Sequence, residues 1–127
     1  AQGQAANHIP VGLRCRQLHF LQSTGGFFTR DGHEVAHWLV RYADGSAVEW
    51  PLIYGDQLRD WWWNYGYPRE ANQAVIAWEG HPNVLANGVR LFKSTWTNPR
   101  PEVEIQELSL VGGDVNASTS VFAITAD

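Results

Sequence analysis

Hydrophobic residues in much of this chain recur at every second position, which is the spacing of a β-strand with one buried face. The clearest case is a predicted hairpin from His33 to Tyr54, with its turn at 43–46. A two-residue Asp-Gly loop would place the apolar residues of the two arms on opposite faces of the sheet. A three-residue loop with Gly45 in the left-handed region places them on one face, so we expect this loop. The pairs that follow are Val40 with Val48, Trp38 with Trp50 and Ala36 with Leu52.

The same alternation predicts strands in the rest of the chain. Residues 11–22 and 103–110 each change phase once, which we interpret as a β-bulge inside each strand. Further predicted strands are 71–79, 89–97 and 119–125. About seven short strands without a convincing amphipathic helix predict an all-β fold, an antiparallel β-sandwich of jelly-roll type. At 127 residues the chain is predicted to form one domain, 1–127, with 1–8 as a flexible lead-in.

The stretch 60–69 interrupts the alternation with three tryptophans and two tyrosines among Asn, Gly and Pro. It is typical of a loop, and such rings either cap the hydrophobic core or form a platform for a ligand with apolar faces. Adjacent residues of an extended segment point to opposite sides, so we expect Trp61 in the core and other rings outside. The predicted outward rings are Trp62, Trp63, Tyr65 and Tyr67, with Asn64, Arg69 and Asn72 as hydrogen-bonding partners of a ligand.

Charge and composition narrow the choice of partner. The net charge of −4 argues against nucleic acid and favours a neutral glycan over a polyanionic one. No apolar run is long enough to cross a membrane, and the first residues lack the features of a signal peptide. Whether a signal has been removed, or the chain is a module of a longer protein, stays open. The single cysteine, Cys15, cannot form an internal disulfide and is predicted to be a small buried apolar residue.

Metal binding and catalysis have weaker support in the sequence. His33 and His37 would stand about 13 Å apart on a strand, too far to share one ion. Turn residues could bind calcium through oxygen atoms, although no EF-hand spacing is present; they are Asp31, Asp44, Asp114 and Asn116. A glycosidase needs two carboxylates beside a cleft, and the candidates near the aromatic stretch are Asp56, Asp60 and Glu79. Such carboxylates occur in most chains of this length, so we predict no catalytic residues and leave the metal ligands unassigned.

Several short segments resemble small galactose-binding-domain-like β-sandwich modules found beside glycan-processing and surface proteins of environmental bacteria. They are His19-Phe20-Leu21, 42–46, 51–56, Asp60-Trp61, Ala77-Trp78, 95–99 and 123–125, and the resemblance covers about residues 9–125. It implies a β-sandwich of the carbohydrate-binding-module type, sometimes with a structural calcium. Its motifs are mostly turn and core positions, so it implies the fold more strongly than the ligand.

The functional hypothesis that follows is non-catalytic carbohydrate binding. An aromatic platform would stack on a neutral polysaccharide and deliver an attached partner to it, in a secreted or cell-surface bacterial protein. The main alternative is a protein-interaction or self-association module, such as a homodimer, because exposed Trp and Tyr are equally favoured in protein interfaces. A small glycan-active enzyme is the second alternative.

Overall fold

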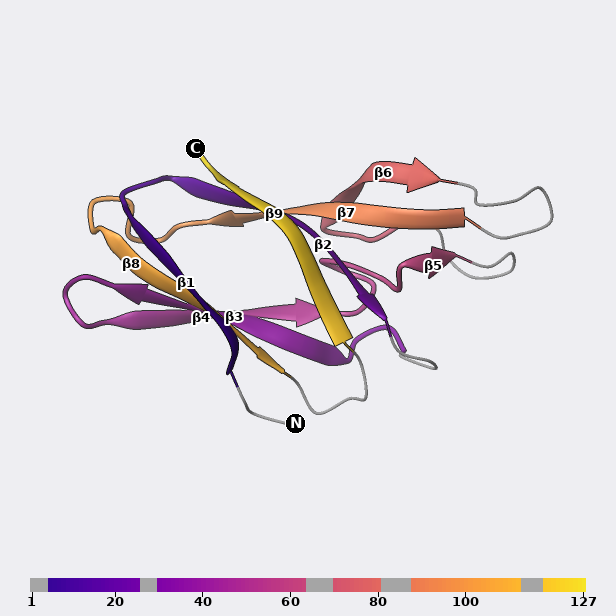
Figure 1. Ribbon diagram of the computed structural model, residues 1–127, viewed down its shortest axis with the longest axis horizontal. Coiled ribbons are helices and arrows are strands. Elements are labelled where there is room, and N and C mark those ends of the chain that lie inside the picture. Colours follow the sequence, from indigo (N-terminus) through magenta and orange to yellow (C-terminus); the bar gives the residue numbers. More distant parts are fainter. Residues whose placement is uncertain (1–4, 26–29, 64–69, 81–87, 113–117) are drawn as a thin grey trace.

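The computed structural model describes residues 5–25, 30–63, 70–80, 88–112 and 118–127. These residues form nine β-strands and no helix, which confirms the all-β prediction (Figure 1). The strands are β1 Ala5–Leu13, β2 Gln17–Gly25, β3 Glu34–Tyr42, β4 Ala47–Ile53, β5 Trp62–Trp63, β6 Ala74–Gly80, β7 Gly88–Thr97, β8 Ile105–Gly112 and β9 Ser118–Ala126.

The strands form two antiparallel sheets that face each other as a β-sandwich. The first sheet has four strands in the order β1-β8-β3-β4. The second has five strands, in which β7 pairs with β2, β5 and β6, and β2 pairs with β9. In Figure 1 the short strands β5 and β6 lie together at one end of the molecule, and the β3–β4 turn lies at the other end.

The β3–β4 hairpin has the predicted register. Val40 pairs with Val48, Trp38 with Trp50 and Ala36 with Leu52. Gly45 has a φ of 91°, so the three-residue loop closes in the left-handed region as the parity of the apolar residues required.

The start of the chain differs from the prediction. The change of phase within 11–22 is a boundary between two strands, because β1 ends at Leu13 and β2 begins at Gln17 in the opposite sheet. Residues 5–8, expected as part of a flexible lead-in, belong to β1 and pair with β8. In β8 the predicted bulge is present, since Arg41 pairs with Glu107 and Tyr42 with Ile105.

The core lies between the two sheets and is rich in aromatic side chains. The rings of Phe20 on β2 and Trp38 on β3 are 4.8 Å apart between centroids, which joins the sheets at the centre. Trp38 donates its indole N–H to Oε1 of the buried Gln22 at 3.2 Å. Other fully buried apolar residues include Val35, Val40, Leu52, Leu58, Phe92, Ile105 and Leu108.

Asn98 organises the end of the sandwich that carries the β3–β4 turn. Its Oδ1 accepts the Tyr42 hydroxyl at 2.6 Å, and its Nδ2 donates to the Cys15 carbonyl at 2.8 Å. Cys15 is buried, as its sequence context predicted, and this burial raises the pKa of its thiol.

Candidate ligand-binding surface

The segment that carries the tryptophan run is built into the five-stranded sheet. Strands β2 and β7 pair directly only from Gln17 to Gln22, and beyond that point they separate. Residues 59–63 fill the gap, since the Trp61 amide donates to the Thr24 carbonyl at 2.7 Å and the Arg90 amide donates to the Trp61 carbonyl at 3.0 Å. The segment expected to be a loop is therefore hydrogen-bonded to sheet strands on both sides.

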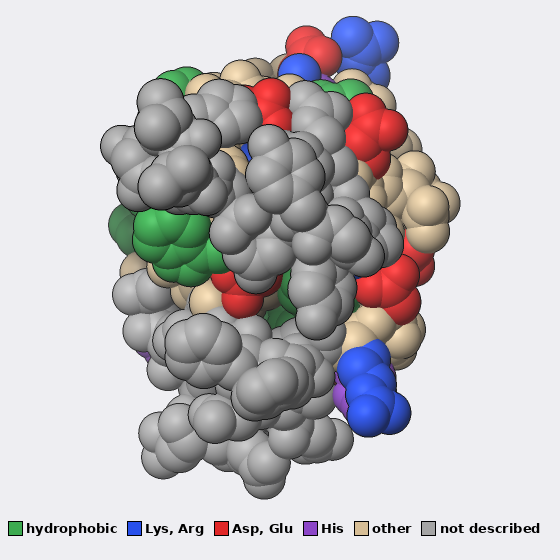
Figure 2. Space-filling model, turned by 90° about the vertical axis from the view of Figure 1, so that its right-hand side faces the viewer, with side chains coloured by type: hydrophobic (Ala, Val, Ile, Leu, Met, Phe, Trp, Pro, Cys, Tyr) green, Lys and Arg blue, Asp and Glu red, His purple; other side chains and the backbone are tan. Residues whose placement is uncertain are grey.

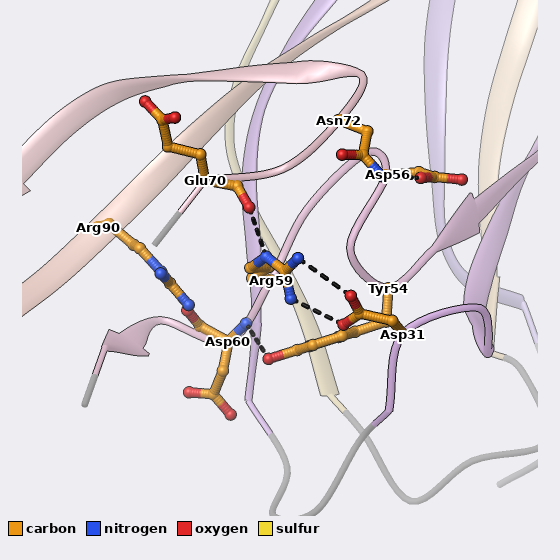
Figure 3. Close-up of polar contacts among 8 residues, drawn as sticks. All are labelled: Asp31, Tyr54, Asp56, Arg59, Asp60, Glu70, Asn72 and Arg90. Carbon is orange, nitrogen blue, oxygen red and sulfur yellow. Dashed lines mark hydrogen bonds and ion pairs between the residues drawn. The ribbon is translucent and has the colours of Figure 1, made fainter. Parts of the chain in front are cut away.

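A buried arginine anchors this segment. The Arg59 side chain is 6% exposed, and its guanidinium binds both carboxylate oxygens of Asp31 at 2.8 and 3.2 Å (Figure 3). Its Nε donates to the Glu70 carbonyl at 2.6 Å, and its Cζ lies 5.7 Å from the Tyr54 ring centroid. Since these partners come from three separate stretches of chain, Arg59 ties together the loops around the tryptophan run.

Asp60 fixes the backbone next to Trp61. Its amide donates to the Tyr54 hydroxyl at 3.0 Å, and its Oδ1 accepts the Trp62 amide at 2.9 Å. Its carbonyl accepts Nε of Arg90 at 3.1 Å. Together these bonds set the direction in which the chain enters β5.

Three aromatic side chains form a row, which we call the aromatic row: Trp78, Trp61 and Phe122. The Trp61 ring centroid lies 5.9 Å from that of Trp78 and 6.0 Å from that of Phe122, with interplanar angles of 18° and 25°. Trp61 is partly buried, whereas Trp78 is 48% and Phe122 54% exposed. The row therefore reaches solvent mainly through its two outer rings.

Two β-bulges set the direction of the Trp78 and Phe122 side chains. On β6, Ile76 pairs with Phe92 and Trp78 with Leu91, so Ala77 is the extra residue and the parity changes before Trp78. On β9, Ala123 pairs with Leu21 and Val121 with Gln22, so Phe122 is itself the extra residue. Bulges commonly redirect a side chain beside a functional site. Here they bring out two rings that regular strands would have turned toward the core.

Beneath the row lies apolar surface that does not belong to the core between the sheets. Val89 and Leu91 alternate along β7 with the core residue Phe92, so they face outward, yet they are 7% and 8% exposed. Trp78 pairs with Leu91, and a Cβ on Gly80 would lie 2.8 Å from Cη2 of Trp78. The edge of the Trp78 indole thus lies against Gly80 at the end of β6.

The predicted site residues fall into three groups. Trp62 is 52% exposed and pairs with Val89, and the exposed Asn72 donates to Oδ1 of Asp56 at 3.0 Å. Trp63 lies in β5, but its side chain is outside the described part of the structure. The other predicted site residues, Asn64, Tyr65, Tyr67 and Arg69, are also outside the described residues.

The aromatic row adds residues that the sequence reading did not assign to a site. Trp61 was expected in the core but packs between two exposed rings, and Trp78 and Phe122 were interpreted as ordinary strand positions. The sequence does hold one signal of the row. The strands 74–80 and 118–126 contain a single charged residue between them, Glu79, which is unusual for edge strands.

Figure 2 shows the end of the molecule that carries β5 and β6. Hydrophobic side chains reach the surface there beside several carboxylates. The nearby guanidinium groups of Arg59 and Arg90 are both buried and hydrogen-bonded to backbone carbonyls. Aromatic rings with carboxylates at their margin suit an uncharged ligand that has apolar faces and hydroxyl edges.

The described residues show no group of three or more His, Cys, Asp or Glu side chains that could hold a metal ion. Two of the residues considered for calcium are in ion pairs, Asp31 with Arg59 and Asp44 with Arg100. The other two, Asp114 and Asn116, lie outside the described residues.

His8, Glu107 and Ser109 contain the residue types of a hydrolase triad but not its geometry. Both the Glu107 carboxylate, at 2.6 Å, and the Ser109 hydroxyl, at 3.0 Å, contact the same ring nitrogen of His8, Nδ1. A triad needs the acid and the nucleophile on different nitrogens, so this cluster cannot relay a proton between them.

Comparison with protein families, curated proteins and solved structures gives no match for this chain. Within the described ranges, no helix is long and apolar enough to cross a membrane. The case for function therefore depends on the geometry of the aromatic row and its surroundings.

Proposed function

We propose that the protein is a non-catalytic carbohydrate-binding module that stacks exposed aromatic rings on a neutral polysaccharide. The observation that carries the proposal is the half-exposure of Trp62, Trp78 and Phe122 around an anchored backbone. A pyranose ring has apolar C–H faces and hydroxyl edges, so it matches aromatic faces bordered by polar groups.

The energy available from these rings fits weak, reversible glycan binding. Stacking that buries roughly 100 Å² per ring, at about 25 cal/mol/Å², contributes about 2.5 kcal/mol per ring before ordering costs. Two rings would give about 5 kcal/mol before those costs, which corresponds to an affinity in the millimolar range, because 1 mM corresponds to about −4 kcal/mol. Anchoring by Arg59 and Asp60 keeps the ordering cost low, since the rings stand on hydrogen-bonded backbone.

The exposed area favours a sugar over self-association. A large aromatic side chain can bury about 150–250 Å², so three half-exposed rings offer roughly 300 Å². A stable protein interface takes about 800 Å² from each partner. The described rings provide less than half of that, which weakens the homodimer alternative.

The proposal extends to the setting of the module. A weakly binding, non-catalytic domain is useful when it holds an attached partner near its polysaccharide. We therefore place the protein outside the cell, as a secreted or cell-surface module.

Affinity electrophoresis in gels that contain soluble polysaccharides tests the proposal. The wild-type protein should be retarded by at least one neutral glycan, and Trp62→Ala and Trp78→Ala should each weaken retardation about tenfold. Leu13→Ala is the matched control, because Leu13 is 39% exposed on β1 of the opposite sheet. Equal retardation of all three variants would place binding elsewhere.

Two other results would replace the proposal. If no glycan retards the protein, and a concentration-dependent dimer is dissociated by Trp62→Ala and Trp78→Ala, the surface is a protein interface. Release of reducing sugars that is abolished by Asp60→Asn would show a glycan-active enzyme instead.

A further inference from the structure

The two outer rings of the aromatic row approach Trp61 from opposite edges of the five-stranded sheet. Trp78 belongs to β6, which pairs with β7, and Phe122 belongs to β9, which pairs with β2. Between them lie β7 and β2, and the Trp61 segment fills the gap where these two strands separate, so the backbones of β6 and β9 are three to four strand spacings apart, roughly 14–19 Å. The row therefore runs across the strands and spans the sheet.

The three rings of the aromatic row are stacked with a sideways offset. Parallel rings in contact are about 3.5–4 Å apart face to face, so centroid separations of 5.9 and 6.0 Å imply a sideways displacement. Because Trp61 covers only part of each neighbour, Trp78 and Phe122 stay about half exposed. Each end of the row thus keeps open aromatic surface.

We propose that the aromatic row is a track for the interior of an extended, linear, neutral glycan chain, with Trp78 and Phe122 as its two end subsites. This inference rests on the proposed function and adds the length and direction of the ligand to it. One pyranose ring is about as wide as one aromatic ring, so a monosaccharide can stack on only one end of the row. A chain of linked sugars laid across the strands contacts both ends.

The charges around the track favour a neutral chain. The protein carries a net charge of −4, and the Arg59 and Arg90 side chains near the row are buried. The exposed Lys93 pairs with Val75 rather than with Trp78. A uronate or sulfate on the sugar would therefore bring further negative charge to an already negative protein, at an electrostatic cost.

The dimensions of the row also argue for a glycan as its occupant. It is one ring wide, and its open area is well below the roughly 800 Å² that each partner of a stable protein complex contributes. A glycan chain has the same narrow, ribbon-like form and alternates apolar faces with hydroxyl edges.

Isothermal titration with cello-, laminari- and malto-oligosaccharides, from the monosaccharide to the hexasaccharide, tests the inference on the full chain. Affinity should rise at least about tenfold with length in one series and then level off. Trp78→Leu and Phe122→Leu keep apolar cover but remove the rings, and each should abolish the gain with length. Val75→Ala is the control, because Val75 is 61% exposed on the same strand as Trp78.

The outcomes separate this inference from the proposed function. If oligosaccharides bind but the monosaccharide binds equally well, or only one of the two Leu variants weakens binding, the track is wrong while carbohydrate binding stands. Preference for polygalacturonate over neutral glycans would show that the ligand is not neutral and would leave the rest of the inference unchanged. If no glycan of either kind binds, the proposed function fails and the inference fails with it.

Discussion

Gly55 and Asp31 approach so closely that a Cβ added to Gly55 would lie 2.8 Å from Cγ of Asp31. Gly55 also has a φ of 92°, a backbone angle that residues with a side chain rarely adopt. The contact places the Asp31 carboxylate against the loop that leads to Arg59, where it forms the bidentate ion pair. A glycine is therefore required twice over at this point, by its backbone angle and by its neighbour.

Gly55→Ala should destabilise the protein more than Gly45→Ala. Gly45 has nearly the same backbone angle, 91°, but a Cβ there would have no atom within 4 Å. The control should cost about 1–2 kcal/mol for backbone strain alone, and Gly55→Ala roughly 2–4 kcal/mol because the Asp31 contact is also disturbed. Chemical denaturation measures both. Equal losses would mean that Asp31 moves aside freely.

Arg59→Lys should weaken both the fold and the binding surface. Lysine keeps the charge but cannot match the fork that contacts Asp31 and the Glu70 carbonyl, so we expect a loss of about 1–3 kcal/mol in unfolding free energy. Arg41→Lys, at an exposed position on β3, is the control and should stay within about 0.5 kcal/mol. If Arg59→Lys matches the control, the ion pair does not anchor the segment.

The predictable parts of the fold are those set by local chemistry. The β3–β4 register follows from Gly45 and from the parity of apolar residues on both arms, which lie within a few positions of each other. The phase change in β8 was visible because apolar positions on both sides of it face the same core. By contrast, the boundary between β1 and β2 resembled a bulge, because apolar positions continue on both sides of Arg14–Arg16.

The outward direction of the Trp78 and Phe122 rings could not be predicted from the sequence, because strand register sets it in both cases. Trp78 has the parity of Ala74 and Ile76, and only the bulge at Ala77, formed against β7, turns it outward. Phe122 similarly becomes the extra residue of β9 through its register with β2. Pairing between distant strands decides the exposure of both rings. The hydrophobic pattern of a single strand does not reveal how that strand pairs with another.

Stability should depend on pH through Asp44 at the β3–β4 turn. Hydrogen bonds from the Ser46 hydroxyl and amide, and then the Arg100 guanidinium, hold the pKa of Asp44 well below its ordinary value of 3.8. Folding thus favours the ionised carboxylate. Its contribution is complete above the ordinary pKa and is lost as the pH falls through the lowered one.

The melting temperatures of wild type and Asp44→Asn, measured from neutral pH downward, check this dependence. Wild type should be more stable by a constant margin above about pH 5, and the margin should close as the pH falls below about 4. Ser46→Ala removes only the hydroxyl and should leave a smaller margin of the same kind. A margin that closes between about pH 6 and 7 would point to a histidine instead.

Gly80→Ala should disturb the aromatic row while leaving the fold nearly intact. The added Cβ would meet Cη2 of Trp78 at 2.8 Å and Cγ2 of Val89 at 3.2 Å, and the half-exposed indole is free to yield toward solvent. We expect oligosaccharide affinity to fall about threefold to tenfold and the melting temperature to change by no more than about 4 °C. Gly25→Ala in β2 is the matched control, because a Cβ there has no atom within 4 Å.

The indole N–H resonance of Trp78 gives a readout that needs no ligand. This resonance should shift in Gly80→Ala and not in Gly25→Ala. An unshifted resonance together with weakened binding would show that the affinity depends on a part of β6 other than the Trp78 ring.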